Sequence, residues 1–289
     1  MLYESPTGLG VNFGILIGGM GMHIDRAVIA VTGYLPNNWL GLRLAIGLRR
    51  IVTMRLPNRG AGIDVERWGL RMRLHPLDNG CEKGLLFTPQ MYETRERAEL
   101  AAEIAIASGR TFVFVDIGAN VGLFSLFVAS QARLARIIAI EPDPENVSRL
   151  RLNIAANPGI PIQVLPIAIE EAAGTVSIKP QCGDRGATKT GPYQAGALKV
   201  KCLPLLEVVD REGLSSIDAL KIDVEGAEDR ILVPFFQAAP KSFWPRLIVI
   251  EDNSDVWRAD LFALLADCGY LIATKTKQNV ILRLIDGCS

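Results

Sequence analysis

The residues that decide the fold read FVFVDIGANVGLFSLFVAS, at positions 112–130. A short apolar run ends at Asp116, a turn containing Gly118 and Gly122 follows, and a second apolar stretch begins at once. Glycines let the backbone turn tightly and approach a ligand, and a helix N-terminus offers free N–H groups. The stretch therefore predicts a strand, a ligand-binding turn and a helix, in that order.

The same alternation of short apolar runs and helical stretches continues on both sides of this unit. Apolar strands separated by helices are typical of a parallel sheet covered on both faces. We expect an α/β, doubly wound, seven-stranded sheet that is mostly parallel and ends in an antiparallel hairpin around Lys277-Gln278. The expected parallel strands are 112–116, 137–141, 162–167, 217–223 and 246–251, and the expected helices are 93–108, 122–134, 144–156, 204–211, 226–238 and 256–267. A further strand pair, 175–179 and 198–202, brackets an expected loop from Pro180 to Ala197.

The turn after the first strand favours a positively charged ligand. A dinucleotide site would have G-x-G-x-x-G to seat a pyrophosphate, whereas the spacing here is G-x-x-x-G with Asp116 two residues earlier. An acid at this place repels phosphate and suits an ammonium or a sulfonium. Glu141 ends the second strand, where a carboxylate can accept hydrogen bonds from a ribose diol, and Pro142 ends that strand.

Acidic residues also follow the fourth and fifth strands. Asp223 lies at the carboxyl edge, where open α/β sheets bind their ligands, and Glu225 follows in the same turn. The fifth strand ends in Glu251, Asp252 and Asn253. Oxygen ligands from Asp223, Asp252 and Asn253 would suit Mg²⁺. The alternative, which we favour, is that no metal is bound and that these residues form a polar wall of the site, or that Asp252 or Asn253 caps the next helix.

Composition narrows the class of protein. The chain has 289 residues, 31 basic and 31 acidic, and this balance argues against a dedicated nucleic-acid binder. Its five cysteines are odd in number and are not spaced like metal ligands, which indicates a reduced, cytoplasmic protein without a zinc site. The apolar run from Leu9 to Met22 has no basic residue before it and is short for a membrane span, so we expect neither a targeting segment nor a transmembrane helix.

Residues 1–80 carry nine basic and five acidic residues, a net charge of +4, and we assign them to an N-terminal extension. Within it we expect a helix over 35–56, capped by Asn37 or Asn38, and a hairpin over 63–75 with Gly69 near the turn. The arginines of the helix suggest attachment to an anionic membrane or partner. The alternative, a helix that covers the core domain, is favoured. Residues 81–289 form the expected main domain.

These blocks together resemble the FkbM-type methyltransferases, a Rossmann-like branch of the S-adenosylmethionine-dependent enzymes. The resemblance covers roughly residues 85–285 and rests on Tyr92-Glu93, FVDIGANVGLFSLFVA at 114–129, IIAIEPDPEN at 137–146, the Ala168 region with Gly174, LKIDVEGAE at 220–228 and IVIE at 248–251. It implies that S-adenosylmethionine is bound by Glu93, Asp116, Gly118, Asn120, Gly122, Glu141, Pro142, Ala168 and Asp223. It also implies that Asp223 and Glu225 lie by the transferred methyl. The sequence departs from the family where strand five ends in EDN.

Methyl transfer to an oxygen follows as the expected reaction. The turn after strand four reads Asp-Val-Glu-Gly, whereas an N-methyltransferase would favour an Asn/Asp-Pro-Pro-aromatic loop there. A hydroxyl is a weak nucleophile, so we assign its orientation or deprotonation to Asp223 or Glu225, assisted by Glu251. The expected acceptor is a hydroxyl of a small molecule, a natural product or a glycan. The alternatives are a non-catalytic binding or scaffold module, and a nicotinamide-dependent oxidoreductase.

Overall fold

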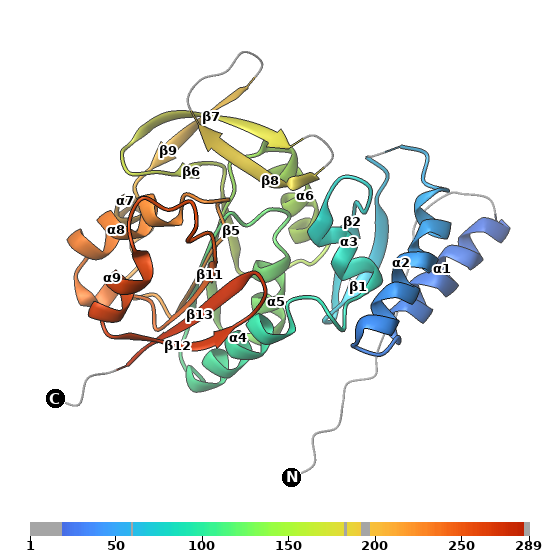
Figure 1. Ribbon diagram of the computed structural model, residues 1–289, viewed down its shortest axis with the longest axis horizontal. Coiled ribbons are helices and arrows are strands. Elements are labelled where there is room, and N and C mark those ends of the chain that lie inside the picture. Colours follow the sequence, from blue (N-terminus) through green and yellow to red (C-terminus); the bar gives the residue numbers. More distant parts are fainter. Residues whose placement is uncertain (1–18, 59, 182–183, 192–196, 286–289) are drawn as a thin grey trace, which may run out of the picture.

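The computed structural model describes residues 19–58, 60–181, 184–191 and 197–285. A seven-stranded sheet runs through the molecule in the order β12-β13-β11-β10-β3-β4-β5 (Figure 1). Its first five strands in the chain are parallel, and β12 and β13 form the antiparallel end. They are β3 (Phe112–Ile117), β4 (Ala135–Ile140), β5 (Ile162–Leu165), β10 (Ala219–Ile222), β11 (Leu247–Glu251), β12 (Tyr270–Lys275) and β13 (Asn279–Leu284). The predicted fold class is confirmed.

Helices cover both faces of this sheet because its strands are apolar on both sides. On one face Val115, Leu220 and Ile250 pack against α7, α8 and α9. On the other face Phe114 and Val249 pack against α4 and α5. The helices are α4 (Thr94–Ile106), α5 (Leu123–Gln131), α6 (Pro144–Ala155), α7 (Leu205–Arg211), α8 (Glu228–Ala238) and α9 (Leu261–Asp267). Each lies within a helix predicted from the sequence.

A separate four-stranded sheet, in the order β6-β9-β7-β8, lies beyond the carboxyl end of β5 (Figure 1). It consists of β6 (Ala168–Ile169), β7 (Gly174–Gln181), β8 (Asp184–Gly191) and β9 (Leu198–Leu203). The predicted pair of strands is present as β7 and β9, which are antiparallel. The predicted loop between them is wrong in part, because Asp184–Gly191 pairs with β7 as a strand. Residues 182, 183 and 192–196 of that loop lie outside the described residues.

The N-terminal extension contains the predicted hairpin and more helix than expected. The hairpin is β1 (Ile63–Arg67) and β2 (Leu70–Leu74), with Gly69 at φ 76° in the turn. The predicted helix is α2 (Trp39–Thr53), and Asn38 caps it by accepting a bond from the Gly41 N–H. Two further helices, α1 (Gly19–Gly33) and α3 (Gly80–Phe87), were not predicted. The apolar run therefore becomes helical from residue 19, and residues 1–18 lie outside the described part.

The extension packs on the sheet domain through a shared core. Met72 and Leu74 of the hairpin belong to the same buried cluster as Leu126 of α5. The side chains of Asn153 and Asn157 also accept hydrogen bonds from the β2 backbone, each at 2.8 Å. The predicted domain boundary after residue 80 therefore lies between two segments that share one hydrophobic core. Within the described residues, no helix has both the length and the apolar character that crossing a bilayer requires.

Candidate active site

A cavity of about 720 Å³ opens at the carboxyl ends of β3, β4, β10 and β11. The turn after β3 forms its floor. Gly118 has a φ of 73°, and a Cβ atom at this position would lie 1.9 Å from the backbone oxygen of Asp223. The Asp223 N–H in turn donates to the Ile117 oxygen at 3.1 Å. Only glycine lets the two strand ends come this close, so the turn and the acidic residue after β10 line one cavity.

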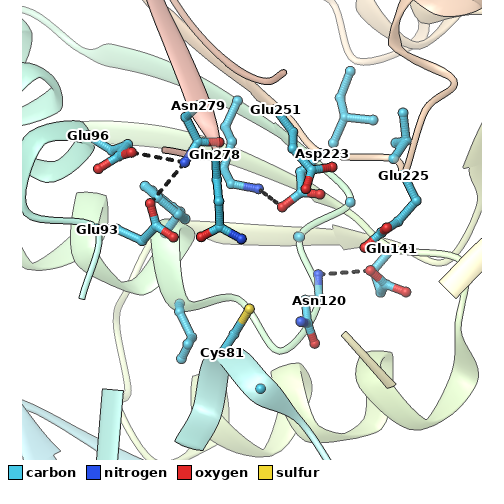
Figure 2. Close-up of a pocket in the computed structure, with 18 of the residues that line it drawn as sticks. Cys81, Glu93, Glu96, Asn120, Glu141, Asp223, Glu225, Glu251, Gln278 and Asn279 are labelled. Carbon is cyan, nitrogen blue, oxygen red and sulfur yellow. Dashed lines mark hydrogen bonds and ion pairs between the residues drawn. The ribbon is translucent and has the colours of Figure 1, made fainter. Parts of the chain in front are cut away.

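Glu141 closes the cavity at the end of β4. Its carboxylate accepts a hydrogen bond from the Asn120 N–H at 2.8 Å (Figure 2). It accepts a second one from the Asp143 N–H at 2.9 Å. Burial raises the pKa of Glu141 to about 7, against the effect of these two donors. Pro142 and Ala168 line the cavity beside Glu141. The sequence-predicted contacts at this end are therefore gathered in one place.

Two predicted contacts lie behind the wall instead of on it. Asp116 is almost fully buried and absent from the cavity lining. One of its oxygens accepts from the Ser125 hydroxyl at 2.7 Å, and the other has no hydrogen-bond partner. Gly122 also lies off the cavity, where its positive φ of 82° starts α5 and its missing side chain makes room for Leu150. Both residues support the turn after β3 from the side that faces away from the cavity.

Three carboxylates meet on the side of the cavity formed by β10 and β11. One oxygen from each of Asp223, Glu225 and Glu251 lies within 4.8 Å of the other two (Figure 2). Burial and the charge of Asp223 raise the pKa of Glu251 to about 8. The Asn253 amide donates to Glu251 at 2.6 Å. The cluster combines the three residues that the sequence assigned to the reaction.

Lys221 supplies the positive charge next to this cluster. Its ammonium lies 3.1 Å from an Asp223 oxygen and 5.1 Å from the centre of the Phe124 ring. Burial by itself lowers the pKa of Lys221, but the charges of Asp223 and Asp116 outweigh burial and raise that pKa above its ordinary value. Lys221 of β10 lies opposite Asp116 of β3 in the sheet register. Its ammonium therefore acts electrostatically on two carboxylates, those of Asp223 and Asp116.

Glu228 holds the turn that carries the acids. One carboxylate oxygen accepts from the N–H groups of Val224 and Gly226 at 3.1 and 3.2 Å, and the other accepts from the Trp257 indole at 2.7 Å. Glu225 lies in this turn with a φ of 58°, a conformation that costs free energy outside glycine. Glu228 is fully buried and keeps that turn in place.

The residues considered for magnesium do not come together. Asp252 pairs with Lys275 at 2.8 Å and does not line the cavity. The Asn253 amide is turned toward Glu228 and Glu251 as a donor, at 3.2 and 2.6 Å, and Asn253 does not line the cavity either. Of Asp223, Asp252 and Asn253, Asp223 alone lines the cavity. These three residues therefore do not form a magnesium site.

The far wall contains residues that sequence analysis missed. Asn279 donates to Glu93 at 3.0 Å and to Glu96 at 2.9 Å, and Gln278 stands beside them (Figure 2). Burial and the charge of Glu96 raise the pKa of Glu93, which was predicted to contact the cofactor, to about 7. Cys81 of α3 lines the opposite side. The hairpin turn at 276–278 was foreseeable, because β12 runs parallel to β11 and ends at the same sheet edge.

Comparison with known proteins identifies the family. A family model described as the Methyltransferase FkbM domain matches residues 116–272, more than half of the 289 residues. The chain is 31% identical over 204 residues to the methyltransferase sdnD of Sordaria araneosa, covering 58% of this chain and 76% of the relative.

Two further relatives are named for the oxygen that they methylate. The 31-O-demethyl-FK506 methyltransferase FkbM of Streptomyces tacrolimicus is 27% identical, over 56% of this chain and 74% of the relative. The 2-O-methyltransferase NoeI of Sinorhizobium fredii is 27% identical, over 42% of this chain and 56% of the relative. The match to the family model spans the glycine turn, Glu141 and all three clustered carboxylates. The chain therefore belongs to the FkbM methyltransferase family.

Proposed function

We propose that this methyltransferase moves the methyl group of S-adenosylmethionine to a hydroxyl oxygen of a small molecule or sugar. The observation that carries the proposal is that the carboxylate cluster of Asp223, Glu225 and Glu251 lines the same cavity as Glu141. Glu141 suits the ribose of a nucleoside, and the cluster suits the proton of a hydroxyl.

The residues present fit S-adenosylmethionine. The volume of about 720 Å³ lies within the range of ordinary ligand sites. The turn at Gly118 leaves the backbone open where a Cβ atom would collide, and the buried oxygen of Asp116 without a partner adds negative charge behind the floor. When bound, S-adenosylmethionine supplies a methyl group activated by a positively charged sulfur. Glu141 would hold the ribose, and Ala168 would lie by the adenine.

The carboxylate cluster would then orient the acceptor hydroxyl and take its proton. A base works best when its pKa is near the working pH, and the pKa of Glu251 is raised to about 8. Asp223 would orient the hydroxyl, because its other neighbour, the Lys221 ammonium, keeps it in position at 3.1 Å. Holding the acceptor oxygen in line for transfer lowers the barrier by several kcal/mol.

Binding of the cofactor is tested first, without any acceptor. Calorimetric titration with S-adenosylhomocysteine should show micromolar binding, and titration with NAD should show none. Glu141→Ala should weaken binding of S-adenosylhomocysteine by at least about tenfold, because the buried ribose hydroxyls would lose a charged acceptor. Absence of binding in a folded sample would shift the function to a scaffold module, and binding of NAD would point to an oxidoreductase.

Turnover is tested with a panel of sugars and hydroxylated natural products, by the release of labelled methyl into product. Asp223→Asn should abolish transfer while S-adenosylhomocysteine still binds. Asp252→Asn is the matched control, since this neighbouring acid pairs with Lys275 outside the cavity, and it should keep transfer within about twofold. Full activity of the Asp223→Asn enzyme would refute the assignment.

A further inference from the structure

The helices α1 and α2 form an antiparallel pair at the edge of the molecule, away from the seven-stranded sheet (Figure 1). The two helices and their ends carry many exposed large apolar side chains. They are Ile24, Val31 and Tyr34 of α1 and its end, and Trp39, Leu40, Leu42, Leu44 and Met54 of α2 and its end. Single exposed apolar residues are ordinary, but a group of them in one element marks an interaction surface.

Three of the exposed apolar residues of α2 and its end lie on one side of the helix. Leu40, Leu44 and Met54 recur along one stripe of α2, while the buried face is formed by Gly41, Ala45 and Val52. Tyr34 and Trp39 stand at the connection between the two helices, and their side chains are 71% and 70% exposed. Aromatic rings with a polar group favour the boundary between water and lipid. The connection therefore has the character of an interfacial tip.

Arginines share the outer surface of α2. The helix contains Arg43, Arg49 and Arg50 and no acidic residue, and Arg43 and Arg50 are exposed. They are seven residues apart, about two helical turns, so both lie on the same side of α2, beside the apolar stripe. Long arginine side chains can rest their stems on apolar surface and keep the charge at its boundary. The surface thus combines apolar insertion with attraction for negative charge.

We propose that the outer face of the α1–α2 pair docks on an anionic phospholipid bilayer. Residues 19–54, which form the two helices and their connection, carry four arginines and one aspartate, a net charge of +3 that complements such a surface, whereas residues 81–289 carry 22 basic and 26 acidic residues. Pairing with a second copy across a two-fold axis would place Arg43 and Arg50 against the same arginines, at an electrostatic cost. A helix that lies in the plane of the interface needs this combination of an apolar stripe and basic flanks.

The test is co-sedimentation of the full chain with vesicles. Vesicles of phosphatidylcholine with an equal part of phosphatidylglycerol should bind the protein, and vesicles of phosphatidylcholine alone should bind it much more weakly. Arg43→Gln with Arg50→Gln should weaken binding about 30-fold, because each basic residue at an anionic surface contributes about fivefold. Leu40→Gln with Leu44→Gln should weaken it about tenfold for each leucine.

The matched control is Arg133→Gln with Leu134→Gln, an exposed arginine and leucine outside the α1–α2 pair, which should bind like the original protein. All variants should keep their affinity for S-adenosylhomocysteine, which shows that they are folded. Equal binding of the control and the α2 variants would overturn the proposal. The proposal would also be overturned if neither kind of vesicle bound the protein. This holds whether light scattering then finds a monomer or finds a dimer that Leu44→Gln dissociates.

Discussion

The backbone of Gly118 lies against the backbone oxygen of Asp223, so close that a Cβ atom on Gly118 would be 1.9 Å from that oxygen. The turn proposed to bind the cofactor and the acid proposed to bind the acceptor therefore keep a constant spacing. This contact joins the ends of β3 and β10, which are neighbours in the sheet. A change at Gly118 should consequently disturb both ends of the reaction.

Gly118→Ala should separate the two strand ends. We expect a loss of stability well above 2 kcal/mol, because the alanine adds both a collision with backbone and a strained positive φ. Gly109→Ala is the matched control, since Gly109 also has a positive φ, of 91°, and has no atom near its Cβ position. It should cost about 1 kcal/mol. Thermal unfolding with and without S-adenosylhomocysteine measures both effects, and similar losses in the two variants would contradict the argument.

The pH dependence of methyl transfer should report Glu251. A base must be ionised to accept a proton, so kcat/KM should rise with pH and level off above about 8, where Glu251 has lost its proton in the free enzyme. In Glu251→Gln the rise around pH 8 should disappear, and the remaining rate should fall by about 100-fold or more. If kcat/KM of the Glu251→Gln enzyme still rises around pH 8, the titrating group is a residue other than Glu251.

Glu228→Ala should release the turn that carries Asp223 and Glu225. Two backbone N–H groups and an indole N–H would lose their buried acceptor, so we expect a loss of about 3 kcal/mol in the free energy of unfolding. Glu228→Gln keeps one carbonyl oxygen as acceptor and should lose less. Glu207→Ala on α7, whose acid pairs with Arg211 at the surface, should change stability little. Denaturant unfolding compares the three, and equal stability of the Ala and Gln forms would exclude the proposed bonding.

Asn79 should affect cofactor affinity from the N-terminal extension. Its amide donates to the Asn120 side chain at 2.8 Å, and its oxygen caps α3 by accepting from the Glu82 N–H at 3.1 Å. Asn79→Ser retains a capping oxygen but is too short to reach Asn120. We expect S-adenosylhomocysteine to bind about fivefold more weakly, with thermal stability nearly unchanged. Unchanged affinity would show that the turn does not depend on this bond.

The sequence by itself determined the elements whose signal is local. The five parallel strands, their helices and the closing hairpin follow from apolar runs of strand length between helical stretches. The turn at Gly118 and the acids after β4, β10 and β11 also follow, because parallel strands end at one edge of a sheet. Hence the family, and several of the residues that line the candidate cavity, could be predicted before the structure.

Tertiary structure decided which side of the wall each residue faces. Glu251 and Asp252 are adjacent in the sequence, but successive side chains at a strand end point to opposite sides, so one enters the cavity and the other pairs with Lys275. Asp116 likewise lies behind the floor, held by Ser125 from the following helix.

The remaining walls depend on contacts between segments far apart in the chain. Asn279 meets Glu93 across 186 positions, and Asn79 reaches Asn120 across 41, and no periodic pattern encodes either contact. The strand β8 was missed because its sequence, DRGATKTG, lacks the apolar alternation of a half-buried strand and becomes a strand only by pairing with β7. Local pattern thus determined the sheet and its acids, and packing between distant segments decided how those acids share one cavity.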